Sequence, residues 1–419
     1  MEPTLLPLLP DTAAFTGGEL VLGGVATSEL VREFGTPLVV YDQPTLLGQA
    51  RAYREAAPDA QVVYGTKAFP SLAILRLFAE QGLGADVSTA GELEFARRAG
   101  ILGERLVVHG NNKEDELLRD ATAARALIVL DSLAELDRAR GWGATRFLIR
   151  VTPGIEADTH EAVKTAHHGS KFGLPPDDAL EALELAGDAE GLHVHVGSQL
   201  QHFGASLMTV DWVAGFAARA RAELGWTPSV VDLGGGLGVR HVLEDPPFTV
   251  EEFVGGLVGE LGRAWKLQGL PAPQLILEPG RSLVSRAGVT LYSVGGVKRA
   301  SAATTYVTVD GGMSDNPRPA LYGARYTALL ANRAEEPATG AYAVAGKHCE
   351  SGDVLIERVE LPEPERGDVL AVPVTGAYTL AMSSTYNAVP RPAAVLVHDG
   401  RARLIRRRET VDDLLAYEV

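Results

Sequence analysis

The stretch QVVYGTKAFPSLAILRLFAE, residues 61–80, sets the fold of this chain. Its first four residues, Gln61–Tyr64, form a short β-branched run that predicts a strand. Its second half, Ser71–Glu80, has the apolar spacing of an amphipathic helix. A strand followed directly by a helix is the unit from which parallel sheets are built, so this stretch favours an α/β fold.

The same unit recurs along the chain from about residue 37. Segments such as Gly91–Ala99, Glu114–Thr122 and Leu133–Arg140 have helical spacing and alternate with strand-like runs. Roughly eight or nine such units over about 250 residues predict a (β/α)₈ barrel of the TIM type, with a doubly wound open sheet as the alternative. The predicted strands are Leu38–Tyr41, Gln61–Tyr64, Gly84–Val87, Leu106–His109, Ala126–Leu130, Arg146–Val151, Gly191–Val196, Ser229–Leu233 and Gln274–Leu277.

The sequence changes character after about residue 285. Short β-branched segments such as Gly288–Val297, Thr305–Val309 and Val354–Val359 are separated by Pro, Gly and Asp turns, which predicts an all-β domain. We expect a barrel domain at 37–285. We expect a β-sandwich or β-barrel-like domain at 286–419 that also takes in the N-terminal arm, residues 1–36.

Composition limits the classes of function. The chain has 419 residues, 46% of them hydrophobic and 22% charged, as in a soluble globular protein with an ample core. A formal net charge of −16 argues against nucleic acid and acidic membranes as partners. The N-terminal Met1–Asp11 lacks a positive region and contains three prolines, so we interpret it as an extended arm and not a signal peptide. With no long uncharged apolar run, we expect a cytoplasmic protein.

The chain contains one cysteine, Cys349, in the run Gly346-Lys-His-Cys-Glu-Ser-Gly-Asp353. A single thiol excludes an intrachain disulfide and a multi-cysteine metal site. An inert buried thiol, an intermolecular bridge and a working thiol remain. The acidic neighbour Glu350 weakens the inert interpretation, because an apolar burial site would not normally have one beside it.

Chemistry in a barrel gathers at the C-terminal ends of the strands. Lys67 follows the strand Gln61–Tyr64, and partial desolvation there would free its amine to form a Schiff base; a surface lysine is the alternative. The strand Gly191–Val196 places His193 and His195 on one face. Zinc ligation, stacking on a flat cofactor and a satisfied core position all remain open for these two histidines.

Two further strand ends carry polar or glycine-rich runs. Gly234-Gly235-Gly236 would let backbone N–H groups approach a phosphate, although plain turns also use such runs. Glu278-Pro-Gly280-Arg281 combines an acid that could hold a protonated ring nitrogen with a cation for anions; a capping turn is the alternative. A lysine, a stacking imidazole, a glycine cradle and an acid on successive strand ends are what pyridoxal 5′-phosphate requires.

These residues resemble the diaminopimelate decarboxylase family, which is a group of pyridoxal-phosphate enzymes with the alanine-racemase fold (fold type III). The resemblance runs nearly end to end. One position departs from the family pattern, because Phe69 stands where the family usually has asparagine. The resemblance rests on Lys67, His193–Gln199, Gly234–Gly236, Glu278–Arg281, Ser170–Gly173, Asp310–Gly323, Cys349–Asp353 and Gly376–Tyr378.

The resemblance implies a role for each matching residue. Lys67 would carry the cofactor as a Schiff base, and His195 would stack on its ring. Glu278 would hold the ring nitrogen protonated. Cys349 would be a catalytic group that reaches the site from the neighbouring subunit of an obligate homodimer. The resemblance also implies phosphate contacts from Ser198, Gly235, Gly236, Gly280 and Arg281, substrate contacts from Arg281, Arg318, Tyr322 and Glu350, and contacts to both from Tyr378.

The implied substrate agrees with the charges of these residues. Meso-2,6-diaminopimelate is an amino acid at both ends, so its distal end requires cations for a carboxylate and an anion for an ammonium group. Loss of carbon dioxide would yield L-lysine, and this reaction would be the last step of lysine biosynthesis. Reprotonation requires a positioned acid; a thiol with a pKa of about 8.5 suits this near neutrality, so Cys349 is the candidate and Lys67 the alternative.

Other functions remain open at this point. The first is a related decarboxylase acting on ornithine, arginine, carboxynorspermidine or a carrier-bound amino acid. Arg318, Tyr322 and Glu350 argue against ornithine and arginine. The second is a cofactor-binding paralogue without activity, which would typically lose Lys67, Cys349 or the β domain. We expect no metal.

Overall fold

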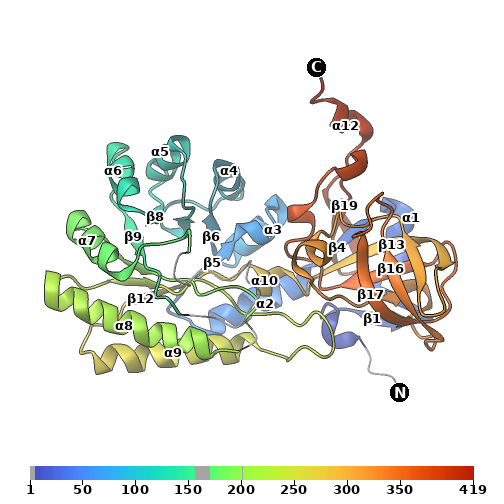
Figure 1. Cartoon of the computed structure of the whole chain (residues 1–419), viewed down its shortest axis with the longest axis horizontal. Helices are drawn as coiled ribbons and strands as arrows, with labels where there is room; N and C mark the ends of the chain where they lie inside the picture. The colour runs from blue at the N-terminus through green and yellow to red at the C-terminus, as the bar shows by residue number, and fades with distance from the viewer. Residues whose placement is uncertain (1–4, 156–169, 201) are drawn as a thin grey trace. The chain divides into compact units, whose positions relative to one another are not determined.

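The computed structural model describes residues 5–155, 170–200 and 202–419 (Figure 1). The chain divides into two compact units. The first, called here the barrel unit, comprises Gln49–Gly238 and Phe248–Ser282. The second, called the β unit, comprises Met1–Gly48, Val239–Pro247 and Leu283–Val419.

The barrel unit contains a closed barrel of parallel strands, which confirms the fold class predicted from the sequence. Its neighbours pair in the order β10-β11-β12-β5-β6-β7-β8-β9. Because every strand runs in the same direction, all their C-terminal ends lie at one rim. The strands are β5 (Gln61–Gly65), β6 (Gly84–Val87), β7 (Leu106–Val108), β8 (Leu127–Leu130), β9 (Phe147–Arg150), β10 (Gly191–His193), β11 (Val230–Asp232) and β12 (Gln274–Leu277).

Helices surround these strands, and each packs on the next around the ring (Figure 1). Two of them, α4 and α9, begin at a threonine whose side chain caps the helix. The Thr89 side chain accepts a hydrogen bond from the Glu92 N–H at the start of α4, and Thr249 and Glu252 form a capping box on α9. The helices are α3 (Leu72–Glu80), α4 (Ala90–Arg98), α5 (Asp115–Ala123), α6 (Leu133–Gly141), α7 (Pro176–Ala186), α8 (Gly204–Leu224) and α9 (Val250–Leu267).

The barrel interior is filled by apolar side chains, as expected of a packed core. One buried cluster joins six of the strands. The cluster consists of Val63, Val107, Leu127, Val129, Leu148, Val230 and Ile276.

The β unit is built on a mixed sheet in the order β17-β16-β14-β13-β4-β19-β20, with β18 pairing β13 and β15. A small sheet, β1 (Ala14–Thr16), β2 (Glu19–Leu22) and β3 (Val25–Ala26), joins the N-terminal segment to this unit, as expected. Helices α1 (Thr27–Phe34), α11 (Arg318–Tyr322) and α12 (Val411–Leu415) complete it, and α2 (Gln43–Ala56) leads out of it. The sheet strands are β4 (Leu38–Asp42), β13 (Gly288–Arg299), β14 (Thr305–Val309), β15 (Leu329–Leu330), β16 (Gly340–Ala345), β17 (Val354–Leu361), β18 (Val369–Pro373), β19 (Ala393–His398) and β20 (Arg401–Arg406).

One predicted barrel strand belongs to the other sheet. Leu38–Asp42 forms β4, but it pairs with β13 and β19 and not with any barrel strand. All five of its residues are buried, and α2 follows directly. A buried run followed by a helix has the same pattern whether the strand lies in a barrel or at the centre of a sheet, which is why the sequence placed it wrongly.

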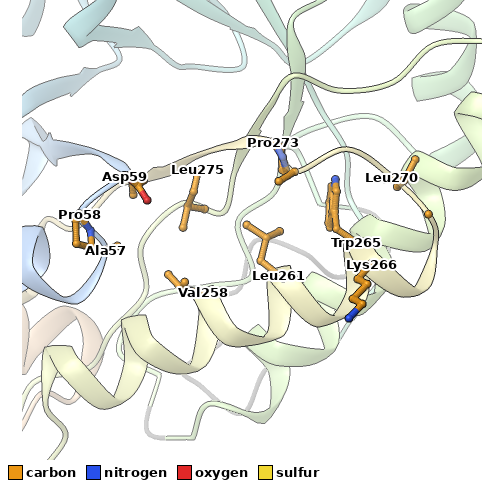
Figure 2. Close-up of a pocket in the computed structure, with 14 residues that line it drawn as sticks. Ala57, Pro58, Asp59, Val258, Leu261, Trp265, Lys266, Leu270, Pro273 and Leu275 are labelled. Carbon is orange, nitrogen blue, oxygen red and sulfur yellow. The ribbon is translucent and has the colours of Figure 1, made fainter.

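A pocket of about 640 Å³ opens in the barrel unit (Figure 2). It lies between α9 and two segments that lead into β5 and β12, so it is at the N-terminal ends of the strands. Leu261, Trp265, Leu270 and Leu275 make its walls largely apolar. The N-terminal rim of such barrels serves stability, so we look for the reaction at the other rim.

Across the described residues, we find no helix with the length and apolar content needed to cross a membrane.

Candidate active site

Lys67 lies just past the end of β5, in the short 3₁₀ helix η2 (Thr66–Ala68). Its Nζ donates a hydrogen bond to Oδ2 of Asp86 at 2.9 Å. Asp86 is on β6 and is buried, whereas 55% of the Lys67 side chain is exposed. The lysine is therefore held by a buried acid and is more exposed than the sequence suggested, because η2 carries it past the strand end.

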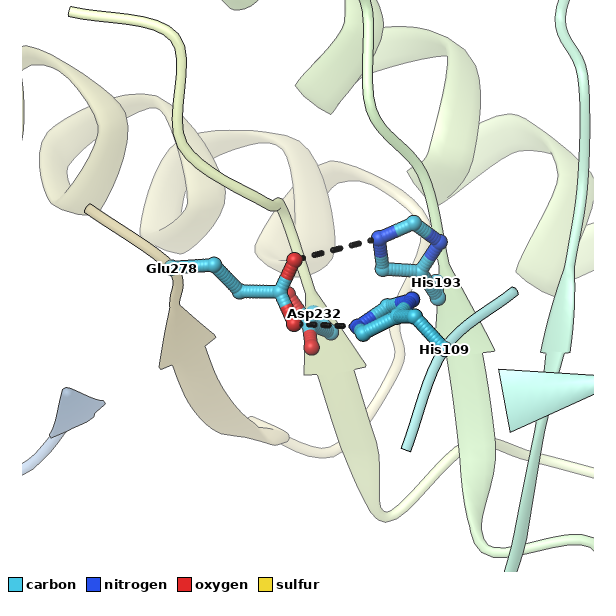
Figure 3. A group of neighbouring side chains, drawn as sticks. All are labelled: His109, His193, Asp232 and Glu278. Carbon is cyan, nitrogen blue, oxygen red and sulfur yellow. Dashed lines mark hydrogen bonds and ion pairs between the residues drawn. The ribbon is translucent and has the colours of Figure 1, made fainter. Parts of the chain in front are cut away.

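Glu278 follows β12 directly and is buried among imidazoles (Figure 3). His109 Nε2 lies 2.5 Å from its Oε1, and His193 Nε2 lies 3.5 Å from its Oε2. Burial alone would raise the pKa of Glu278, but the adjacent His109, and then His193, hold it well below its usual range. Burial lowers the pKa of His193 well below its usual range. The site therefore holds an ionised carboxylate against a neutral His193.

Asp232, the last residue of β11, is the fourth member of this group. Its Oδ1 accepts a hydrogen bond from the Gly234 N–H at 2.8 Å. Burial, and then the charge of Glu278, raise its pKa well above the usual range. These opposite directions favour the neutral form of Asp232 and the ionised form of Glu278.

His109, His193, Asp232 and Glu278 offer ligand atoms that lie within 4.8 Å of one another, and a divalent metal accepts such donors. The sequence left zinc open for His193 together with His195, but the described residues place His109, not His195, in this group. The 2.5 Å separation of His109 and Glu278 is that of a short, charge-assisted hydrogen bond, so a proton lies between them.

His195 lies beside the glycine run that follows β11. The Gly235 N–H donates to its Nδ1 at 3.4 Å, and burial, followed by the charges of Lys67 and Arg150, lowers its pKa to about 3. The imidazole is therefore neutral, and a flat neutral ring can stack on another ring. A Cβ on Gly234, whose φ is +66°, would lie 2.4 Å from the His195 Nδ1, so this approach requires glycine.

Arg281 and Ser198 contact each other at the rim formed by the C-terminal strand ends. The Arg281 Nη2 donates to the Ser198 Oγ at 3.0 Å, and Arg281 is buried. Gly280 lies against β5, since a Cβ on Gly65 would be 3.3 Å from its Cα. A guanidinium, a hydroxyl and glycine backbone form a chemically suitable anion site.

Together these barrel residues fit pyridoxal phosphate. The fit rests on three groups at one rim of the barrel. These are the exposed amine of Lys67, the buried carboxylate of Glu278, and the glycine run Gly234–Gly236, where any larger side chain would clash with its neighbours.

The remaining predicted residues lie in the β unit. Arg318 begins α11 and is buried; its Nη1 donates to the Tyr326 Oη at 2.5 Å and to the His241 Nε2 at 2.9 Å. Tyr322, at the end of α11, and Tyr378 are half-buried. Tyr378 has a left-handed φ of +58°, which is unusual for a residue other than glycine.

Cys349 and Glu350 lie in an exposed loop between β16 and β17. The Cys349 N–H donates to the Asn387 Oδ1 at 3.0 Å, and the Glu350 Oε2 lies 3.5 Å from the Tyr386 Oη. The buried Asp353 fixes the loop by accepting the His348 N–H at 2.8 Å. This thiol is exposed, so the inert core cysteine considered from the sequence is excluded.

The sequence missed Asp86, His109, Arg150 and Asp232. Each lies at or near the C-terminal end of a strand that the sequence did predict, and that position was the available signal. A single acid or histidine on a strand has no motif to mark it, so the partners of Lys67 and Glu278 emerge only from the fold.

Comparison with known proteins gives one consistent family. The family of pyridoxal-dependent decarboxylases, represented by its pyridoxal-binding domain, matches residues 45–285. The diaminopimelate decarboxylase of Actinosynnema pretiosum subsp. auranticum is 46% identical over all of this chain and 97% of its own length. The diaminopimelate decarboxylase of Corynebacterium efficiens is 42% identical over 96% of this chain and 92% of its own.

A solved structure agrees with these relatives. The crystal structure of diaminopimelate decarboxylase from M. jannaschii in complex with L-lysine superposes with a TM-score of 0.90. It is 33% identical to this chain and covers 98% of both chains. The likeness therefore includes both units.

Proposed function

This chain belongs to the diaminopimelate decarboxylase family of pyridoxal-dependent decarboxylases, and from that membership we propose how its residues perform the reaction. The protein is an enzyme that decarboxylates meso-2,6-diaminopimelate to L-lysine with pyridoxal 5′-phosphate. The observation that carries this conclusion is the match over the full length of the relatives, which includes the β unit as well as the cofactor-binding barrel.

The barrel residues bind and orient the cofactor. Pyridoxal phosphate supplies an electron sink for the carbanion that remains when carbon dioxide leaves. Lys67, beside Asp86, provides the amine that holds the cofactor. Glu278, whose pKa is held low by its neighbours, would keep a proton on the ring nitrogen, and His195 would stack on the ring. The phosphate contacts come from the set Ser198, Gly235, Gly236, Gly280 and Arg281.

The β unit supplies substrate contacts. The Arg318 guanidinium can pair with the distal carboxylate, since its orientation is set by Tyr326 and His241. Tyr322 and Arg281 add to that grip. Glu350 pairs with the distal ammonium, and Tyr378 contacts both cofactor and substrate.

Cys349 is the group that returns a proton to the substrate carbon. Its thiol is exposed in the β16–β17 loop, where a partner surface can cover it. We propose a homodimer in which Cys349 and Glu350 enter the barrel of the partner subunit. The protein would work in the cytoplasm, where a single reduced thiol is stable.

The test is to incubate purified protein and pyridoxal phosphate with meso-diaminopimelate, L,L-diaminopimelate or L-ornithine. We expect lysine and carbon dioxide in equal amounts from the meso isomer, and much slower turnover of the others. Turnover of ornithine with none of the meso isomer would overturn the assignment.

A further inference from the structure

We propose that His109 is a positioning residue that fixes the Glu278 carboxylate for the ring nitrogen of the cofactor. This inference deepens the proposed function and rests on it. His109 has no role in the set derived from the sequence, and it lies one residue past the end of β7.

The first support is the geometry of the contact. His109 Nε2 is 2.5 Å from Glu278 Oε1, and both side chains are buried. The rings of His109 and His193 pack edge to face, with centroids 4.8 Å apart, so the His109 ring cannot turn freely. A contact held in this way fixes both the position and the rotation of the carboxylate.

The second support is the direction of the hydrogen bond. An ionised carboxylate only accepts, so the proton belongs to His109 Nε2. The bond engages Oε1 and leaves Oε2 to meet another donor, with His193 farther away at 3.5 Å. His109 thereby decides which oxygen faces the ring nitrogen.

The third support is that His109 lies near both Glu278 and Asp86, the acid that holds Lys67. Its Nε2 is also 3.9 Å from Oδ1 of Asp86. The His109 Nε2 therefore lies near two buried carboxylates and bonds to that of Glu278. Without it, burial would raise the pKa of Glu278 against the weaker effect of His193, in a group that also contains the carboxyl of Asp232.

The consequence is measurable. His109→Leu should raise the pKa of Glu278, because a group that lowers it is removed, so that the carboxylate stabilises a protonated ring less well. Loss of a charge-assisted hydrogen bond corresponds to roughly a tenfold to hundredfold effect. We expect cofactor binding to weaken by about tenfold or more, and the acid limb of the kcat–pH profile to move to higher pH.

The experiment compares His109→Leu, His109→Gln and Val107→Ala. Gln restores an N–H donor near the position of Nε2, whereas Val107→Ala removes buried volume from the same strand and leaves Glu278 untouched. Each variant is assayed for the pyridoxal phosphate dissociation constant, the pH dependence of the visible absorbance of the bound cofactor, and the melting temperature.

The proposal predicts that Leu shifts the dissociation constant and the spectral pH dependence, that Gln recovers most of both, and that Val107→Ala changes only the melting temperature. Equal spectra and binding for His109→Leu and wild type would overturn it. Equal shifts in all three variants would also overturn it, because packing would then be the cause. If the wild-type protein binds no pyridoxal phosphate, the proposed function itself fails instead.

Discussion

The barrel rim and the β16–β17 loop both carry candidate catalytic groups, but in opposite environments. Around Glu278 the groups are buried and hydrogen-bonded to one another. Around Cys349 the side chains of Cys349 and Glu350 are exposed, and the loop is held by backbone hydrogen bonds to Asp353 and Asn387.

The difference indicates two kinds of task. Holding an ionised acid for a cofactor requires preorganised partners, which one chain can supply by itself. Delivering a proton to a substrate carbon requires a group that contacts the substrate. A group in an exposed loop can contact a bound substrate only when another protein surface packs against that loop. We therefore expect substitutions at the barrel rim to impair cofactor binding, and substitutions in the β16–β17 loop to impair proton transfer while leaving the cofactor bound.

The largest effect should come from Lys67→Ala. We expect it to abolish decarboxylation and the visible absorbance of the bound cofactor, because Lys67 provides the amine that would hold the cofactor. Absorption spectra of the reconstituted protein measure this. Lys266→Ala, at an exposed position on α9, is the matched control. An unchanged spectrum in Lys67→Ala would mean that another lysine holds the cofactor.

Cys349→Ala should reduce kcat by roughly a hundredfold or more, the usual contribution of a positioned acid, and leave cofactor binding intact. Stopped assays and spectral titration separate the two quantities. Mixing this variant with Lys67→Ala sharpens the comparison. If Cys349 enters the partner's barrel, an equal mixture should recover about a quarter of wild-type activity, because half of the sites in each mixed dimer are intact. No recovery, with mixed dimers demonstrated, would place Cys349 in its own subunit's site.

Arg318→Lys should mainly weaken substrate capture. Lysine keeps the charge but loses the bidentate geometry and the hydrogen bond to the His241 ring. We expect kcat/KM for meso-diaminopimelate to fall by roughly tenfold to hundredfold with an unchanged cofactor spectrum. A fall in cofactor affinity of the same size would argue against a substrate role.

The last prediction concerns stability, and we expect little effect on activity from it. Burial raises the pKa of Asp315 to about 7, against the lowering effects of the Tyr292 and Gly312 hydrogen bonds, with Asp353 and Asp310 adding to the rise. The folded carboxyl then keeps its proton up to about pH 7, while the unfolded one loses it near pH 4. Its contribution is therefore present below about pH 4 and declines as the pH rises to 7, by on the order of 4 kcal/mol.

Asp315→Asn should remove that slope from the free energy of unfolding measured between pH 4 and 8. Tyr292→Phe, which deletes a bond that lowers the pKa, should extend the slope above pH 7. An Asp315→Asn profile parallel to that of wild type would show that this carboxyl is ionised when folded.

The sequence predicted the barrel well because its strands are short apolar runs at regular spacing. It also predicted Glu278 correctly as a residue at a strand end. It missed β16, since Gly340-Ala-Tyr-Ala-Val-Ala345 has little β-branched content, and it assigned β4 to the wrong sheet.

The partners of the predicted residues were beyond the reach of the sequence. Glu278 and His109 are 169 residues apart, and only closure of the barrel brings β7 and β12 to one rim. The burial that decides their ionisation likewise depends on the whole packed core and not on neighbouring residues.

The most direct measurement of the central claim is made on the lysine formed from meso-diaminopimelate in D₂O, by mass spectrometry for its deuterium content and by NMR spectroscopy for the configuration at the labelled carbon. We predict lysine with one deuterium, on the carbon that loses carbon dioxide and in a single configuration, because a positioned acid delivers it to one face. Absence of lysine, or lysine labelled equally in both configurations, would contradict the account.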